Sequence, residues 1–129
     1  MKTLLFIPFL FMCSIVIGQS SKIIGKPIKI GKLEVAQYDF PTQMIWDDAK
    51  KACADLGSGW RLPTKDELNL MYLNEDKIGG FDGIYYWSST EEDYETAWRQ
   101  YFVSDNGNGG FQSYGFMDGD NSVRAVRSF

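Results

Sequence analysis

Two kinds of residue in this sequence could support nucleophilic or acid–base chemistry: a cysteine and clustered carboxylates. Cys53 could act as a nucleophile only beside a base that takes its proton, and the sequence contains no histidine. Carboxylates cluster at residues 66–67 and 91–95, which we expect to be a helix start and a turn. Clusters of this kind are usually solvated surface. We therefore expect no catalytic residues and a protein that is not an enzyme.

Oxygen-rich turns are the next candidates, because carboxylate and amide oxygens are the ligands that calcium prefers. Two such clusters lie at residues 105–108 and 118–121, but neither has the full spacing of an EF-hand loop. A type I′-like turn explains both equally well. The lack of histidine also removes most zinc sites. We expect no metal and no cofactor, with calcium as the alternative.

A ligand-binding surface is the remaining possibility, and residues 104–122 are its strongest signal. Fifteen of these 19 residues are Ser, Asp, Asn, Gly or Tyr, a mixture that resembles an antibody paratope. The alternative is an ordinary turn-rich meander, which needs the same small residues. Tyrosine and arginine in the preceding segment favour a surface. The candidate ligand-binding residues are Tyr94, Arg99, Tyr101, Asn106, Asn108, Gln112, Tyr114, Asp118, Asp120 and Asn121.

Net charge narrows the class of partner. The chain has 13 basic and 17 acidic residues, and all 17 acids but only eight of the bases follow Lys32. Proteins that bind nucleic acids or sulphated polysaccharides normally present a basic face. We therefore expect a protein or glycan ligand, no nucleic acid, and no preference for polyanions.

The first 18 residues differ from the rest of the chain. They hold one charged residue, Lys2, and an apolar run that is shorter than the roughly 20 residues of a membrane span. This pattern predicts a signal peptide over residues 1–18; an uncleaved anchor is the alternative. We expect export to the periplasm, the cell surface or the medium, with no stable membrane span after cleavage. Only Cys53 then remains, so no disulfide can form within the chain.

Hydrophobic spacing indicates which elements position these residues. We expect a lead-in segment or edge strand over residues 19–32, followed by one domain over 33–129. Alternation predicts a strand over 33–40, and spacings of three and four predict a helix over 46–56. A capping box begins a second helix at Thr64, which should end near Asn74. Strands are predicted over 84–90, 97–103, 111–117 and 122–129. This order indicates an α+β domain.

A second group of residues should form the framework rather than the surface. We expect the four tryptophans to be buried instead of forming a sugar-stacking platform, and the arginines to pair with carboxylates or carbonyl oxygens. We also expect Cys53 to be a buried small hydrophobe on the inner face of its helix. The framework residues are Trp46, Trp60, Arg61, Thr64, Glu67, Trp87, Trp98, Arg124 and Arg127.

Three strings taken together resemble one known family. They are Trp60-Arg-Leu-Pro-Thr64, Tyr86-Trp-Ser-Ser-Thr90 and Val123-Arg-Ala-Val-Arg127. Over roughly residues 33–129 the chain is similar to the Lcl C-terminal domain-like family, which is known from the end of a bacterial collagen-like adhesin. That family is related to the formylglycine-generating-enzyme-like branch of C-type lectin-like folds.

The resemblance implies a C-type lectin-like fold, in which two helices flank a small twisted antiparallel sheet and the N- and C-terminal strands pair. The Glu-Pro-Asn and Trp-Asn-Asp motifs of lectin calcium sites are missing from this sequence. Together with the composition of residues 104–122, this fold leads us to expect a monomeric, non-enzymatic, adhesin-like module that binds a protein or glycan through residues 79–122. The alternatives are an interaction subunit of a cell-surface assembly, which would use the lead-in segment as its contact, and an enzyme related to the formylglycine-generating branch.

Overall fold

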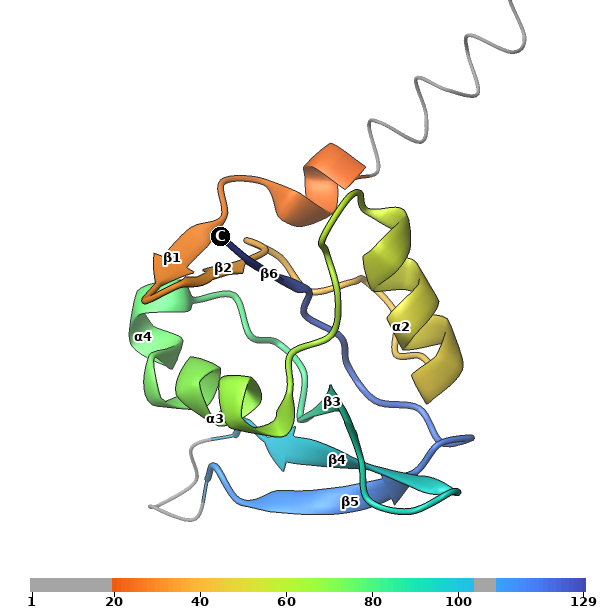
Figure 1. Ribbon diagram of the computed structural model, residues 1–129. Coiled ribbons are helices and arrows are strands. Elements are labelled where there is room, and N and C mark those ends of the chain that lie inside the picture. Colours follow the sequence, from red (N-terminus) through yellow and green to blue (C-terminus); the bar gives the residue numbers. More distant parts are fainter. Residues whose placement is uncertain (1–19, 104–108) are drawn as a thin grey trace, which may run out of the picture.

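The computed structural model describes residues 20–103 and 109–129, which form two small antiparallel sheets flanked by helices (Figure 1). The elements in chain order are β1 (Ile28–Ile30), β2 (Leu33–Val35), α2 (Trp46–Asp55), α3 (Lys65–Leu73), α4 (Glu75–Ile78), β3 (Tyr85–Glu91), β4 (Thr96–Tyr101), β5 (Gln112–Phe116) and β6 (Val126–Ser128). The predicted α+β class is confirmed. Within the described residues, none of the helices has the length and apolar character needed to cross a bilayer.

The two ends of the described chain meet in one sheet, whose strand order is β1-β2-β6. Leu33 lies opposite Ser128, which confirms that the first and last strands of the domain pair. β2 is shorter than the predicted strand because the regular strand pairing ends after Val35. The next hydrogen bond, from Ala36 N to Ala125 O, lies outside the strand. The lead-in segment supplies the edge strand β1, whereas residues 20–24 are helical, which the sequence pattern did not indicate.

The helices begin where local sequence signals place them. α2 buries Trp46, Ala49 and Cys53 along one face. α3 begins with the predicted capping box: the Thr64 hydroxyl accepts from Glu67 N at 3.2 Å, and Thr64 N donates to Glu67 Oε1 at 2.9 Å. This pairing satisfies two backbone N–H groups that a helix start leaves without partners. α3 ends at Leu73, next to the predicted end at Asn74, and the short α4, which was not predicted, follows directly.

The second sheet has the order β3-β4-β5 and lies at the opposite end of the molecule from the first sheet in Figure 1. Its strands begin and end within two residues of the predicted ranges. The last strand is much shorter than predicted: residues 122–125 bond to other segments, and Trp87 N donates to Ser122 O at 3.1 Å. Residues 122–125 therefore connect the two sheets instead of extending β6.

The β3-β4-β5 sheet is covered by helices over part of each face. Neighbouring residues of a strand face opposite sides of its sheet. Trp87 packs in the cluster that contains Cys53 of α2, whereas Tyr86 packs with Leu68 and Met71 of α3. Four of the ten candidate ligand-binding residues lie in the strands of this sheet: Arg99, Tyr101, Gln112 and Tyr114.

Candidate ligand-binding surface

Three aromatic rings and one arginine lie together on one face of the β3-β4-β5 sheet. The rings of Tyr101 and Phe111 are stacked, with centroids 4.8 Å apart and planes 19° apart. The Tyr85 ring contacts both of them edge-on, at centroid distances of 5.2 and 6.0 Å. The guanidinium carbon of Arg99 lies 3.9 Å from the centre of the Tyr85 ring. We call Tyr85, Arg99, Tyr101 and Phe111 the aromatic–arginine patch.

Strand register brings the patch together. Tyr85 of β3 lies opposite Tyr101 of β4, and Arg99 lies opposite Ser113 of β5. Phe111 precedes β5, and its carbonyl oxygen accepts from Tyr101 N at 3.0 Å. Because side chains that are opposite each other across a pair of strands share a face, the patch follows from this pairing.

The Arg99 side chain is fixed by neutral partners. Nε donates to Ser113 Oγ at 3.4 Å, and Nη1 donates to Asn121 Oδ1 at 3.2 Å. A Cβ placed on Gly115 would lie 3.3 Å from the guanidinium carbon of Arg99, so the missing side chain leaves room for the guanidinium group over β5. The patch is therefore ordered before any ligand arrives.

The patch is accessible to solvent. Phe111 is 47% exposed, and Tyr85, Arg99 and Tyr101 are half-buried. Large contiguous apolar patches on a protein surface mark interaction sites, whereas scattered apolar side chains do not.

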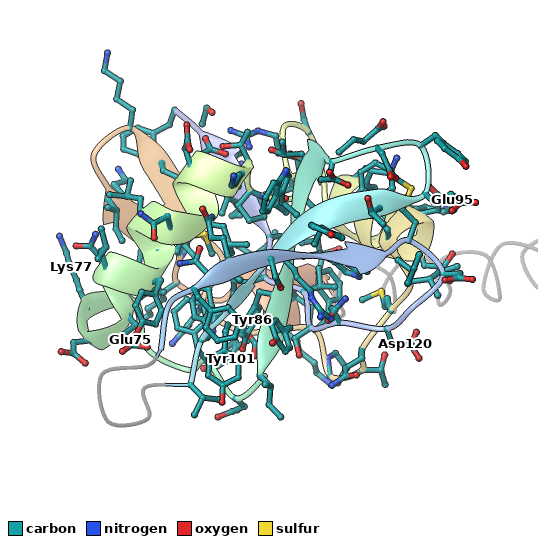
Figure 2. All side chains as sticks on the ribbon, turned by 90° about the horizontal axis from the view of Figure 1, so that it is seen from below. Glu75, Lys77, Tyr86, Glu95, Tyr101 and Asp120 are labelled. Carbon is teal, nitrogen blue, oxygen red and sulfur yellow. The ribbon has the colours of Figure 1, made fainter. Side chains whose placement is uncertain are left out.

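A second candidate region lies at the other end of the same sheet. Tyr94 is 85% exposed in the turn between β3 and β4, and Phe116 is 65% exposed at the end of β5. They line an open hollow of about 520 Å³ together with Glu95, Met117 and Asp118. Figure 2 shows Glu95 and Asp120 toward this end and Tyr101 toward the other.

The structure therefore divides the predicted surface into separate regions. Arg99 and Tyr101 belong to the patch, while Tyr94 and Asp118 line the hollow. Asp120 is exposed on the segment after β5. Asn106 and Asn108 lie outside the described residues.

Two predicted residues lie on the opposite face of the sheet. Tyr114 is 57% exposed there and contacts Trp98 edge-on, with ring centroids 6.0 Å apart. Gln112 donates to the carbonyl oxygen of Lys65 at 2.8 Å, so it joins β5 to the start of α3. Their alternation with Ser113 explains the placement, because strand residues alternate between faces.

Asn121 requires a correction. It is 5% exposed, and its main chain pairs with Met44 while its side chain accepts from Arg99. A buried amide of this kind is a supporting residue and not a contact residue. No local pattern indicates that Asn121 is buried, because asparagine is also common in exposed turns.

Tyr85 and Phe111 are the patch residues that sequence reasoning missed. Both fall in segments predicted as strands, but their position beside Arg99 depends on the strand register, which no local pattern specifies. A recess of about 840 Å³ was also missed; it lies between residues 20–23, the chain at 38–42 and α2.

The framework residues mostly behave as predicted, with one correction. Trp46, Trp60 and Trp87 are buried. Trp98 is not a core residue. It is half-buried on β4, and the ammonium group of Lys65, the first residue of α3, lies 3.4 Å from its ring centre. α3 begins at this point, so a lysine stem covers the indole in place of apolar side chains.

The predicted arginine pairings are present. Arg124 contacts Asp39, and Arg127 contacts Glu34. Arg61 forms a two-pronged pair with Glu67, with N–O distances of 2.6 and 2.9 Å. The hydrogen bond from Arg61 holds the pKa of the Glu67 carboxyl below its usual value.

The chemistry-bearing residues lie in unreactive environments. Cys53 is fully buried, and burial raises the pKa of its thiol to about 12. The main-chain N–H of Glu95 and the Thr96 hydroxyl donate to Asp93, which lowers the pKa of that carboxyl and marks it as a turn residue. In the part of the chain that the structure describes, no three cysteine, aspartate or glutamate side chains converge as a metal site would require.

Comparison with known proteins supports the fold. No family model matches the sequence, and no curated protein is significantly similar to it. Among solved structures, the chain is similar to C-type lectin-like proteins of snake venom. EMS16, an antagonist of the collagen receptor integrin alpha2beta1, matches with a TM-score of 0.59 at 12% identity, covering 80% of this chain and 97% of its own.

Two further neighbours agree with the first. Botrocetin matches with a TM-score of 0.59 at 10% identity, over 81% of this chain and 96% of its own. Rhodocetin matches with a TM-score of 0.57 at 12% identity, over 80% and 97%. The chain thus has a C-type lectin-like fold, as predicted.

Proposed function

We propose that this protein is an exported, monomeric, non-enzymatic module that binds a protein partner through the aromatic–arginine patch. The observation that carries the proposal is the patch itself: Tyr85, Tyr101 and Phe111 contact one another on an accessible sheet face, with Arg99 over the Tyr85 ring. Tyrosine and arginine are enriched among the residues that contribute most to protein–protein binding. Because the rings already contact each other, little side-chain entropy is lost when a partner binds.

The environments of the chemistry-bearing residues support a binding role over catalysis. The Cys53 thiol has no accessible surface, and the Glu67 carboxyl is bound to Arg61. The solved neighbours support it as well, since EMS16 is an antagonist of an integrin and botrocetin is known in complex with the A1 domain of von Willebrand factor. Their low identity limits that support to the fold and its capacity for protein recognition.

The N-terminal residues support export. Residues 1–18 have the charge and length pattern of a signal peptide. N-terminal sequencing of the protein recovered outside the cytoplasm should begin at or near Gln19. Recovery of the uncleaved chain in the membrane fraction would contradict the cleavage.

An array experiment tests the binding role. The protein is applied to arrays of cell-surface proteins and of glycans, and each positive signal is repeated with Tyr101→Ala and Phe111→Ala. Binding to a protein should weaken at least about tenfold in both variants, the loss expected for a central contact residue. The matched control is Leu73→Ala, which removes a side chain that is 70% exposed on α3, the helix that packs with Tyr86 on the opposite face of the sheet.

Each variant must keep the melting temperature of the parent protein. Protein ligands that bind all three variants equally would show that the patch is not the binding surface. Signals confined to the glycan array would replace the protein partner by a glycan.

A further inference from the structure

The four arginines of this chain differ in their partners. Arg61, Arg124 and Arg127 each contact a carboxylate, at distances of 2.6, 2.8 and 2.6 Å. Arg99 forms no ion pair with any of the described residues, although it is held in place by Ser113 and Asn121. The planar guanidinium group forms its strongest hydrogen bonds with carboxylates and phosphates.

The Arg99 guanidinium group retains donors for a ligand. Arginine has five N–H donors. Nε and Nη1 donate one hydrogen bond each, which leaves three N–H groups without partners among the described residues. Stacking on the Tyr85 ring orients the planar fork. A fork of this geometry matches the two oxygens of a carboxylate.

The net negative charge of the domain limits the kind of anion that Arg99 can bind. The chain after Lys32 carries 17 acidic and eight basic residues, so it repels an extended polyanion. A single carboxylate can still reach one oriented guanidinium group at short range. The adjacent rings of Tyr101 and Phe111 would contact an apolar neighbour of that carboxylate.

We propose that Arg99 is the specificity-determining residue of the patch, and that it binds an aspartate or glutamate side chain that lies beside an apolar residue in the protein partner. This inference rests on the proposed protein-binding function and adds the chemistry of the recognised group.

A peptide selection tests the inference. A displayed library of random peptides is selected on the full protein and then depleted on a Tyr101→Ala, Phe111→Ala variant, so that only patch-dependent peptides remain. These peptides should be enriched in aspartate or glutamate next to an apolar residue. The strongest peptide is then synthesised with its acidic residue intact and with that residue changed to the matching amide.

The two peptides and the Arg99 variants form a double-mutant cycle. The wild-type protein should bind the acidic peptide about tenfold or more tightly than the amide peptide, the usual gain from a charge-assisted hydrogen bond. Arg99→Gln should bind both peptides equally. Lys65→Gln is the matched control, because it removes a positive charge over an aromatic ring on the opposite face, and it should keep the full preference.

A second variant covers the case in which Arg99→Gln fails to fold. Gly115→Ala keeps the charge but places a methyl group against the guanidinium group, so the preference for the acidic peptide should fall. Patch-dependent peptides without an acidic preference would overturn this inference and leave the proposed function standing. A selection that yields no patch-dependent peptide would contradict both.

Discussion

Arg124 and Asp39 form a buried ion pair between residues that lie 85 positions apart in the sequence, with Nε 2.8 Å from Oδ1. The same guanidinium group donates to the carbonyl oxygens of Ala36 and Gly79, and the Tyr86 hydroxyl donates to the second oxygen of Asp39. This network joins the terminal sheet, the segment before β3 and the β3-β4-β5 sheet that carries the patch. Burial, followed by the bond to Asp39, raises the pKa of the Tyr86 hydroxyl.

Replacing Arg124 should be far more costly than replacing Arg127. The Arg124 side chain has no exposed surface, so Arg124→Met removes the cation paired with Asp39 and the donor to two carbonyl oxygens, and it should cost about 3–5 kcal/mol of unfolding free energy. The Arg127 side chain is 38% exposed, and Arg127→Met should cost about 1–2 kcal/mol. Urea denaturation of both variants measures the difference, and equal losses would show that burial does not separate the two pairs.

Acid should weaken the Arg61–Glu67 contribution to stability. The pKa of Glu67 is lower in the folded chain than its usual value of 4.5, so its contribution is complete above about that pH and is lost as the pH falls through the folded value. Glu67→Gln should therefore cost about 1 kcal/mol at neutral pH and nearly nothing at about pH 2. Urea denaturation across this range checks the trend. A cost that does not change with pH would show that the ionised Glu67 carboxylate is not the source of the contribution.

Cys53 should not react with alkylating reagents while the protein is folded. Its thiol is fully buried and has a pKa of about 12, so the reactive thiolate is scarce and inaccessible. Iodoacetamide labelling followed by peptide mass spectrometry, which distinguishes Cys53 from Cys13, should detect modification only after denaturant is added. Rapid labelling of the native protein would contradict the structural role of this residue.

Removal of divalent cations should leave the melting temperature unchanged. Asp118 and Asp120 are exposed, but no third described acidic or thiol group joins them in a metal-binding cluster. A bound ion would stabilise the folded state according to its concentration and affinity. A chelator titration monitored by thermal melting checks this, and a fall of several degrees that calcium reverses would establish a calcium site.

The local elements could be predicted from the sequence because their signals depend on residues three or four positions apart. The Thr64–Glu67 capping box and the buried stripe of α2 are examples, and both occur as predicted. The buried state of Cys53 follows from the same stripe. These features require no knowledge of the rest of the chain, since neighbours on a helix are set by its 3.6-residue turn.

The sequence indicated the residue types of a binding surface, but it could not indicate which of those residues lie on the same face. Arg99, Tyr101, Tyr114 and Asn121 were all predicted to bind the ligand, but only Arg99 and Tyr101 belong to the patch. Tyr114 faces the opposite side, and Asn121 is buried against Arg99.

The sequence by itself determined the α+β class, the principal helices, the strand segments and the identity of the buried tryptophans other than Trp98. The tertiary structure alone decided that Tyr85 and Phe111 meet Tyr101, and that Arg99, unlike the other arginines, has no acidic partner among the described residues. The physical reason is range: helix signals act within one turn of the chain, whereas pairing between strands is chosen by the packing of the whole domain.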